Sequence, residues 1–168
     1  MNATERGIRE QFPLWNKVSQ DVGRPEAGTV HVVVGCGTSV HIADSIADTL
    51  NRKGFFARAV AGNEWTRRPG DYVPTALNPR ILALSRSGES TETVAAAAAS
   101  RAHGLHVTAF TCAESTSLAE NADTVVMAET HPEEGIVMTA SASLMLLMGL
   151  RYAGISVTPS TTSTAEKL

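Results

Sequence analysis

Five short apolar runs recur along the chain, separated by longer stretches of mixed polar and apolar residues. Each run is a near-continuous series of Val, Ile, Leu, Phe and Ala rather than a strict alternation with polar residues. That pattern is typical of strands covered on both faces, as in parallel sheets. The predicted strands are residues 29–35, 55–60, 80–85, 106–111 and 123–128.

The stretches between these runs have the spacing of helices. The predicted helices are residues 38–52, 90–103, 115–122 and 138–153. Another is predicted over residues 4–20, where Ile8, Phe12, Trp15 and Val18 fall on one stripe at helical spacing. Alternating strands and helices form βαβ units with right-handed crossovers. We therefore predict an α/β fold, a three-layer α/β/α sandwich with a five-stranded parallel sheet in the order 2-1-3-4-5.

Two regions depart from this alternation. Residues 63–79 contain three prolines and a Gly-Asp step, and we expect a surface loop there. Residues 156–168 have no apolar face and are predicted to be a polar tail or linker. The expected organisation is thus an N-terminal helix and lead-in over residues 1–27, one folded domain over residues 28–155, and the tail.

Composition narrows the class of protein. The chain has 168 residues, about one domain, of which 43% are hydrophobic and 18% are charged, as in globular proteins. A net charge of −3 gives no reason to expect nucleic acid or a membrane as a partner, and no apolar run approaches bilayer-spanning length. The polar first residues do not resemble a signal peptide. Since Cys36 and Cys112 lie in apolar stretches without metal-type spacing, we expect a cytoplasmic protein with reduced cysteines.

Two polar turns follow the first and third predicted strands. The first is Gly-Cys-Gly-Thr-Ser over residues 35–39, and the second is Ser-Arg-Ser-Gly-Glu-Ser over residues 85–90. In the order 2-1-3-4-5 these strands are neighbours at the point where the strand order reverses, which is where ligands bind in open parallel sheets. We therefore expect both turns to face one crevice.

The chemistry of the two turns suits an oxygen-rich anion. A helix begins after each turn and directs free backbone N–H groups and the positive end of its dipole into the crevice. Gly37 and Gly88 allow the backbone to approach a ligand closely. Neutral hydroxyl donors are added by Thr38, Ser39, Ser85, Ser87 and Ser90. The alternative is that Ser90 or Thr91 only caps its helix.

Several other motifs are incomplete in this sequence. The first turn lacks the third glycine of the G-x-G-x-x-G dinucleotide fingerprint, and no acid ends the second strand to bind a ribose. There is no G-x-x-x-x-G-K-[ST] phosphate loop, and Ser87 is not in a G-x-S-x-G elbow. The histidines show no metal spacing. We therefore expect no cofactor and no metal ion.

The order of these motifs resembles the sugar isomerase (SIS) domain family. The resemblance covers residues 28–155 and is carried by GCGTS before an apolar helix and by LSRSGEST before an alanine-rich helix. The segment HPEEGIVMTASASLMLLMGL, together with Arg86 and Trp15, is similar to the N-terminal half of the tagatose-6-phosphate ketose/aldose isomerase subgroup. This resemblance implies a five-stranded parallel sheet in three layers and the binding of a phosphosugar.

The resemblance also implies which residues bind the ligand. Those that would bind the phosphate or line the sugar are Gly37, Thr38, Ser39, Ser85, Arg86, Ser87, Ser90, Val137 and Thr139. Within this set the serines of the second turn hold the phosphate, and the last two residues contact the sugar. Arg86 either reaches the anion or lies in solvent. Glu89 is expected to accept hydrogen bonds from backbone donors rather than to bind the ligand.

Aldose–ketose exchange needs a general base near C1 and C2 of the sugar. Family members with this pattern usually carry their acid–base residues in a second such domain, and the polar tail of this chain resembles the linker to one. Candidates within this chain are Glu133, Glu134, His131 and His41. The two acids could instead be partners of a helix dipole, and His41 could reach across a dimer interface.

Two functional hypotheses follow. In the first, the chain is an aldose–ketose isomerase or an amino-sugar-6-phosphate deaminase/isomerase, either complete as a homodimer or larger oligomer or as half of a two-domain enzyme. In the second, it binds or senses a sugar phosphate without turnover. In both the partner is a hexose or amino-hexose 6-phosphate. They differ in whether a competent base lies in the crevice.

Overall fold

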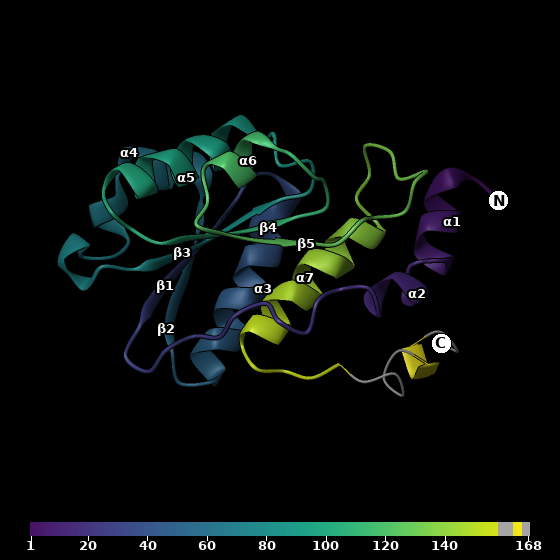
Figure 1. Ribbon diagram of the computed structural model, residues 1–168, viewed down its shortest axis with the longest axis horizontal. Coiled ribbons are helices and arrows are strands. Elements are labelled where there is room, and N and C mark those ends of the chain that lie inside the picture. The colour runs from purple at the N-terminus through teal and green to yellow at the C-terminus, as the bar shows by residue number, and fades with distance from the viewer. Residues whose placement is uncertain (158–162, 166–168) are drawn as a thin grey trace.

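A five-stranded, all-parallel sheet forms the centre of the molecule (Figure 1). The computed structural model describes residues 1–157 and 163–165. The strands are β1 (Val30–Gly35), β2 (Phe56–Ala61), β3 (Arg80–Ser85), β4 (Val107–Thr111) and β5 (Thr124–Met127). Their order is β2-β1-β3-β4-β5, so the predicted fold class and strand order are confirmed.

Helices cover both faces of the sheet. The helices α3 (Thr38–Arg52) and α7 (Ala140–Tyr152) pack on one face. On the other lie α4 (Gly62–Arg67), α5 (Thr91–Ala102) and α6 (Ser117–Glu120), above the sheet in Figure 1. This arrangement is the predicted three-layer sandwich.

The core has two parts because successive side chains of a strand point to opposite faces. Val33 faces α3 and α7, whereas its neighbours Val32 and Val34 face α5. On the α5 side, Ala96 and Ala97 are fully buried, and such small side chains let the helix lie close to the sheet. The larger buried side chains, such as Val33, each stabilise the fold by roughly 1.5–3 kcal/mol.

The strand order reverses between β1 and β3. Val33 of β1 pairs with Ala59 of β2 on one side and with Leu82 of β3 on the other. The helix after β1 crosses one face of the sheet and the helix after β3 crosses the opposite face. Both helices therefore begin at the same edge, beside the carboxyl ends of the two strands.

The predicted N-terminal helix over residues 4–20 is wrong, because the segment forms two short helices. These are α1 (Ala3–Arg9), capped by the side chain of Asn2, and α2 (Phe12–Trp15). Pro13 lies in the first turn of α2, where the missing N–H is tolerated; inside one continuous helix it would remove a hydrogen bond and clash with the preceding turn.

The predicted loop over residues 63–79 is wrong in part, because the segment begins with α4. Trp65 of this helix is buried, and its Nε1 donates to Ser100 Oγ at 2.8 Å. Beyond α4 the prolines permit only two 3₁₀ turns, η1 (Pro69–Asp71) and η2 (Thr75–Leu77). The predicted polar tail falls partly on residues 158–162 and 166–168, which lie outside the described residues.

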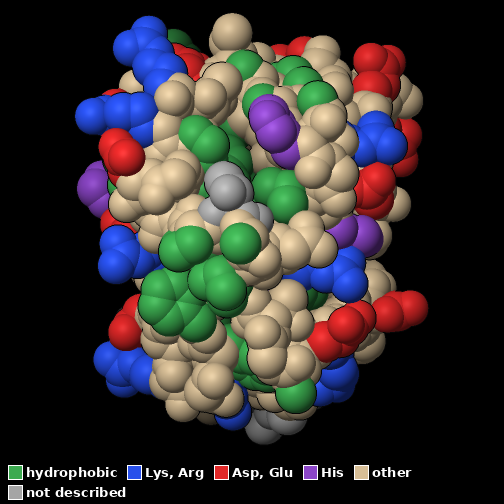
Figure 2. All heavy atoms as spheres, turned by 90° about the vertical axis from the view of Figure 1, so that its left-hand side faces the viewer, with side chains coloured by type: hydrophobic (Ala, Val, Ile, Leu, Met, Phe, Trp, Pro, Cys, Tyr) green, Lys and Arg blue, Asp and Glu red, His purple; other side chains and the backbone are tan. Residues whose placement is uncertain are grey.

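Charge is mixed on the face of the molecule that Figure 2 shows. In the described part of this face, basic and acidic side chains alternate around the rim, and hydrophobic side chains gather nearer the centre. It presents no extended basic surface of the kind that binds nucleic acid. Across residues 1–157 and 163–165, no helix combines the length and apolar character needed to cross a bilayer.

Candidate functional site

The two polar turns lie side by side at the carboxyl edge of the sheet. We refer to residues 35–39 as the β1 turn and to residues 85–90 as the β3 turn. They end two strands that pair in parallel from His31 and Arg80 up to Val34 and Ala83. The structure thus brings together the two turns as the sequence predicts.

The β1 turn depends on its glycines. A side chain at Gly35 would lie 2.7 Å from the backbone of Ser39, so only glycine fits there. Gly37 has φ +56°, a conformation that favours glycine, and its position is open to solvent. Thr38 is exposed at the start of α3, whereas Ser39 is 5% exposed and faces the interior. Of the predicted residues in this turn, Gly37 and Thr38 are therefore the ones open to a ligand.

The β3 turn places three serine hydroxyls above the start of α5. Ser85 is buried, and its Oγ donates to Ser90 Oγ at 3.1 Å. Ser87 is exposed, and its Oγ accepts the backbone N–H of Glu89 at 3.2 Å. The hydroxyls of Ser85 and Ser90 therefore lie together, and hydroxyl groups can donate to an anion.

Ser90 occupies the N-cap position of α5 but does not act as a side-chain cap. Its backbone is extended, as at an N-cap, yet its hydroxyl accepts no hydrogen bond from the first turn of the helix. The hydroxyl instead receives the Ser85 donor. The helix-cap alternative is therefore wrong for the Ser90 side chain, and the first N–H groups of α5 are not used by it.

Residues just before and at the start of α6 contact the β3 turn and stabilise it. Gly88 has φ +68°, and a side chain there would come within 2.3 Å of Thr116 Oγ1. Glu89 accepts hydrogen bonds from the backbone N–H and the hydroxyl of Ser117, at 2.8 and 2.6 Å. These bonds lower the pKa of the Glu89 carboxyl below its usual range. The prediction that Glu89 accepts from a backbone donor is confirmed.

Few charged groups of the described residues lie near the β1 and β3 turns. Arg86 is half-buried rather than in solvent, and its guanidinium donates to the carbonyl of Gly135. Cys36 lies in the β1 turn; burial raises the pKa of its thiol, and the neighbouring Glu92 of α5 raises it further. The contact between Cys36 and Glu92 could not be predicted from the sequence, because the two residues belong to different βα units.

The loop from β5 to α7, residues 128–139, is organised by Glu134. Its carboxylate accepts hydrogen bonds from the Thr130 hydroxyl and from the backbone N–H and hydroxyl groups of Thr139 and Ser141. Burial alone would raise the pKa of this carboxyl, but these hydrogen bonds outweigh it and hold the pKa below the usual range. Glu134 therefore caps α7 and keeps its charge.

The other candidate bases are also engaged or lie elsewhere. Glu133 forms an ion pair with Arg6 of α1. His131 is buried, and both of its ring nitrogens are hydrogen-bonded, to Glu10 and to the backbone N–H of Glu133. His41 is exposed on α3, one turn after the β1 turn.

The two predicted sugar contacts differ in exposure. Val137 is 62% exposed near the tip of the β5–α7 loop, whereas Thr139 is half-buried and bonded to Glu134. Among the described residues, no three His, Cys, Asp or Glu side chains are grouped so that they could hold a metal ion. The site consists of hydroxyls, backbone N–H groups and one guanidinium.

Comparison with known proteins identifies the family. The model of the SIS domain matches residues 31–152 of the sequence. The chain belongs to the SIS domain family. This match spans both turns, α5 and α7 of the candidate site. It leaves α1 and α2 outside.

Individual members of the SIS family resemble this chain over only part of their own length. It is 30% identical, over 115 residues, to glutamine–fructose-6-phosphate aminotransferase (isomerizing) of Pyrobaculum aerophilum, covering 68% of this chain and 19% of that protein. Tagatose-6-phosphate ketose/aldose isomerase from Escherichia coli superposes with a TM-score of 0.73 at 25% identity, covering 91% of this chain and 48% of the isomerase. Glucosamine-6-phosphate deaminase from Thermotoga maritima has a TM-score of 0.73 at 24% identity, covering 99% and 53%. The chain therefore spans about half or less of these three proteins.

Proposed function

We propose that the crevice between the β1 and β3 turns binds the phosphate group of a phosphorylated sugar. The observation that carries this proposal is the pairing of the Ser85 and Ser90 hydroxyls at 3.1 Å, at the point where the strand order reverses. The adjoining N-termini of α3 and α5 add backbone N–H donors and positive dipole ends. The ligand class is a hexose or amino-hexose 6-phosphate, and the ligand-binding unit is the predicted domain over residues 28–155.

Neutral donors are sufficient for such a ligand. Charge-assisted hydrogen bonds contribute roughly 1.5–3 kcal/mol each, so a few hydroxyl and N–H donors hold a phosphate without a cluster of lysines. Arg86 lies beside the serines and adds the one positive charge of the β3 turn. Gly37 and Thr38 complete the other wall, where they are exposed.

The proposal is tested by titrating the purified protein with glucosamine 6-phosphate and with fructose 6-phosphate. We expect dissociation constants between roughly a micromolar and a millimolar. The double variant Ser85→Ala, Ser87→Ala should bind at least about tenfold more weakly, because each lost hydroxyl removes a charge-assisted hydrogen bond. Ser45→Ala, at an exposed serine of α3, is the matched control. Undiminished binding by the double variant would show that the serines are not the phosphate site.

A second candidate function is aldose–ketose isomerisation or deamination of the bound 6-phosphosugar. It is supported by the similarity to tagatose-6-phosphate ketose/aldose isomerase, at 25% identity. The difficulty lies in the base, since Glu133, Glu134 and His131 are all held by other groups. Turnover would need a base from a second copy of the chain, where the exposed His41 is a candidate, or from residues outside those described. Two assays decide between turnover and binding alone: one follows the conversion of glucosamine 6-phosphate and water into fructose 6-phosphate and ammonia, and the other follows the isomerisation of glucose 6-phosphate to fructose 6-phosphate.

We also propose that the protein is cytoplasmic and forms a homodimer or larger oligomer. Cys36 and Cys112 are free thiols, which suits a reducing compartment. Assembly would supply the missing base, because an exposed residue of one copy can reach the crevice of another. Sedimentation of the purified protein measures its oligomeric state.

A further inference from the structure

The N-terminal segment is bound tightly along α7, although it lies outside the region that matches the family. Trp15 Nε1 donates to Ser143 Oγ at 2.9 Å, and the buried guanidinium of Arg151 donates to the carbonyls of Trp15, Val18 and Ser19. Val18 belongs to the main apolar core. In Figure 1 this segment runs beside α7 and ends next to the β5–α7 loop. It is part of the folded body.

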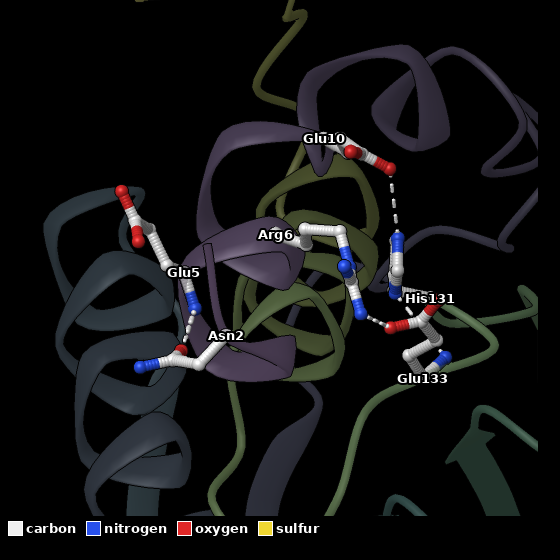
Figure 3. A network of polar contacts seen from close by, with 6 residues as sticks. All are labelled: Asn2, Glu5, Arg6, Glu10, His131 and Glu133. Carbon is white, nitrogen blue, oxygen red and sulfur yellow. Dashed lines mark hydrogen bonds and ion pairs between the residues drawn. The ribbon is translucent and has the colours of Figure 1, made fainter.

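Helix α1 contacts the β5–α7 loop at three points. The Arg6 guanidinium pairs with Glu133, and Glu10 lies 3.0 Å from Nε2 of His131 (Figure 3). Gly7 packs so closely on the loop that a side chain there would lie 2.5 Å from Thr139 Oγ1. The contacts thus reach both ends of the loop segment that precedes α7.

The contact through His131 involves a buried ring. The ring is 7% exposed, and its Nδ1 accepts the backbone N–H of Glu133 at 3.2 Å. Nε2 therefore carries the proton and donates to Glu10 in the neutral ring. Through this one side chain, α1 fixes the backbone direction of the loop at Glu133.

The tip of the loop has little anchoring of its own. Ile136 is 95% exposed and Val137 is 62% exposed, so burial of apolar surface does not hold them. The described contact from the other side of the crevice is the hydrogen bond from Arg86 to the carbonyl of Gly135. Besides the bonds of Glu134 to the start of α7, the loop is therefore held by α1 on one side and by the β3 turn on the other, and its distance from the serines depends on both.

We propose that α1 is a positioning element for the sugar-side wall of the site, with Arg6 and Glu10 as the positioning residues. This inference rests on the proposed function. Phosphate is bound by the β3 turn, which α1 does not touch in any of the described contacts. The sugar ring needs the β5–α7 loop at a set distance from the serines. Loosening α1 therefore weakens binding of the sugar phosphate while inorganic phosphate binds as before.

The same helix offers a matched control. Glu5 and Arg9 form an ion pair with each other at 3.3 Å, and neither side chain has a described bond to the β5–α7 loop. The test variant is Arg6→Gln, Glu10→Gln and the control is Glu5→Gln, Arg9→Gln. Each removes one positive and one negative charge from the same short helix, so the two variants have equal net charge.

Two measurements decide the proposal. The first titrates wild type and both variants with glucosamine 6-phosphate and with inorganic phosphate. We expect the test variant to bind glucosamine 6-phosphate roughly tenfold more weakly and inorganic phosphate within about twofold of wild type. The second follows hydrogen exchange of the loop amides in the free protein, where we expect exchange roughly tenfold faster in the test variant. The control variant should match wild type in both measurements.

Several results would overturn the proposal. One is wild-type exchange of the loop amides in the test variant. Another is equally weakened binding of glucosamine 6-phosphate and of inorganic phosphate by the test variant. That result would indicate a general loss of structure, and the β1 amides would then also exchange faster. If wild type binds neither probe, the proposed function fails, and the exchange measurement still decides whether α1 positions the loop.

Discussion

The β3 turn and the β5–α7 loop lie at the same edge of the sheet but are held in different ways. The β3 turn is stabilised by neighbours in the sequence: Ser85 and Ser90 are five residues apart, and Glu89 bonds to Ser117, 28 residues away. The loop has local hydrogen bonds too, since the partners of Glu134 are 4 to 7 residues away, but it is also held by partners much farther along the chain, at separations of 121 residues for His131 and Glu10 and 127 for Glu133 and Arg6.

The two regions also differ in what stabilises them. The β3 turn ends a fully buried strand and fits around a glycine. The loop relies on polar contacts, above all those of Glu134, while its tip is exposed. Hydrogen bonds contribute only about 1 kcal/mol each on a net basis, so a segment held by them opens more readily than one set in the core. We infer that the phosphate side of the site is rigid and the sugar side adjustable.

The largest expected effect comes from Gly88→Ala, which attacks the rigid side. Its added side chain would meet Thr116 at 2.3 Å, in a backbone conformation of φ +68° that disfavours any residue with a β-carbon. The two penalties together should lower the free energy of unfolding by about 3 kcal/mol. Urea denaturation measures this loss, and binding of inorganic phosphate should be lost with it.

Gly104→Ala separates the two penalties in that experiment. Gly104 has φ +76° but no atoms within 4 Å of its would-be side chain. It should cost only roughly 1–2 kcal/mol, from backbone conformation alone. Equal losses in the two variants would mean that packing against Thr116 does not hold the β3 turn.

An intermediate loss of stability is expected from Glu134→Gln, which changes the β5–α7 loop on the adjustable side of the site. The amide keeps one acceptor oxygen but presents an NH₂ donor to hydroxyl and N–H donors, so about 2 kcal/mol of stability should be lost. Amides of the loop should exchange faster, whereas those of the β3 turn should not. Hydrogen exchange followed by mass spectrometry measures both segments in one sample. Faster exchange in both segments would show that the two sides of the site are not independent.

The same substitution has a defined pH dependence. The pKa of Glu134 lies below the usual 4.5 in the folded protein, so its contribution is fully present above that value. This contribution to the free energy of unfolding is lost as the pH falls through the folded pKa. The reason is that the Glu134 carboxyl of the unfolded chain has the higher pKa and therefore takes up a proton at a higher pH than the folded protein does. The difference in denaturation midpoint between wild type and Glu134→Gln should therefore narrow below pH 4.5. A constant difference across that range would contradict the assigned role of the carboxylate.

The sequence was sufficient to predict the rigid side of the site. Buried strands show as continuous apolar runs, and polar turns with glycine mark their ends, so the β1 and β3 turns could be located before the fold was known. The parallel pairing of the two strands then followed from the alternation of strands and helices. The alternative that Ser90 caps α5 through its side chain is wrong, and the hydroxyl oxygen of Ser90 instead accepts from Ser85, five residues away.

The adjustable side could not be predicted in the same way. Nothing near His131 in the sequence indicates Glu10 as its partner, and the apolar stripe over residues 4–20 suggested one helix where Pro13 begins a second. Glu134 was a candidate base because it lies in the segment that resembles the isomerase subgroup, but the hydrogen bonds that its carboxylate accepts depend on how the loop folds back. A polar contact between residues far apart in the sequence leaves no recognisable pattern near either residue. The roles of the site residues that depend on such contacts remain proposals.

The smallest expected effect comes from Glu89→Gln, the counterpart of Glu134→Gln on the rigid side. Both carboxylates accept hydrogen bonds from a helix start, but Glu89 is exposed and its carboxylate has only Ser117 as a described partner. Water can replace those bonds, and the glycine fit at Gly88 is unaffected. The shift in denaturation midpoint should therefore be well under half of that for Glu134→Gln, with unchanged exchange at the β3 turn. A shift as large as that of Glu134→Gln would mean that polar contacts, rather than packing, hold both sides of the site.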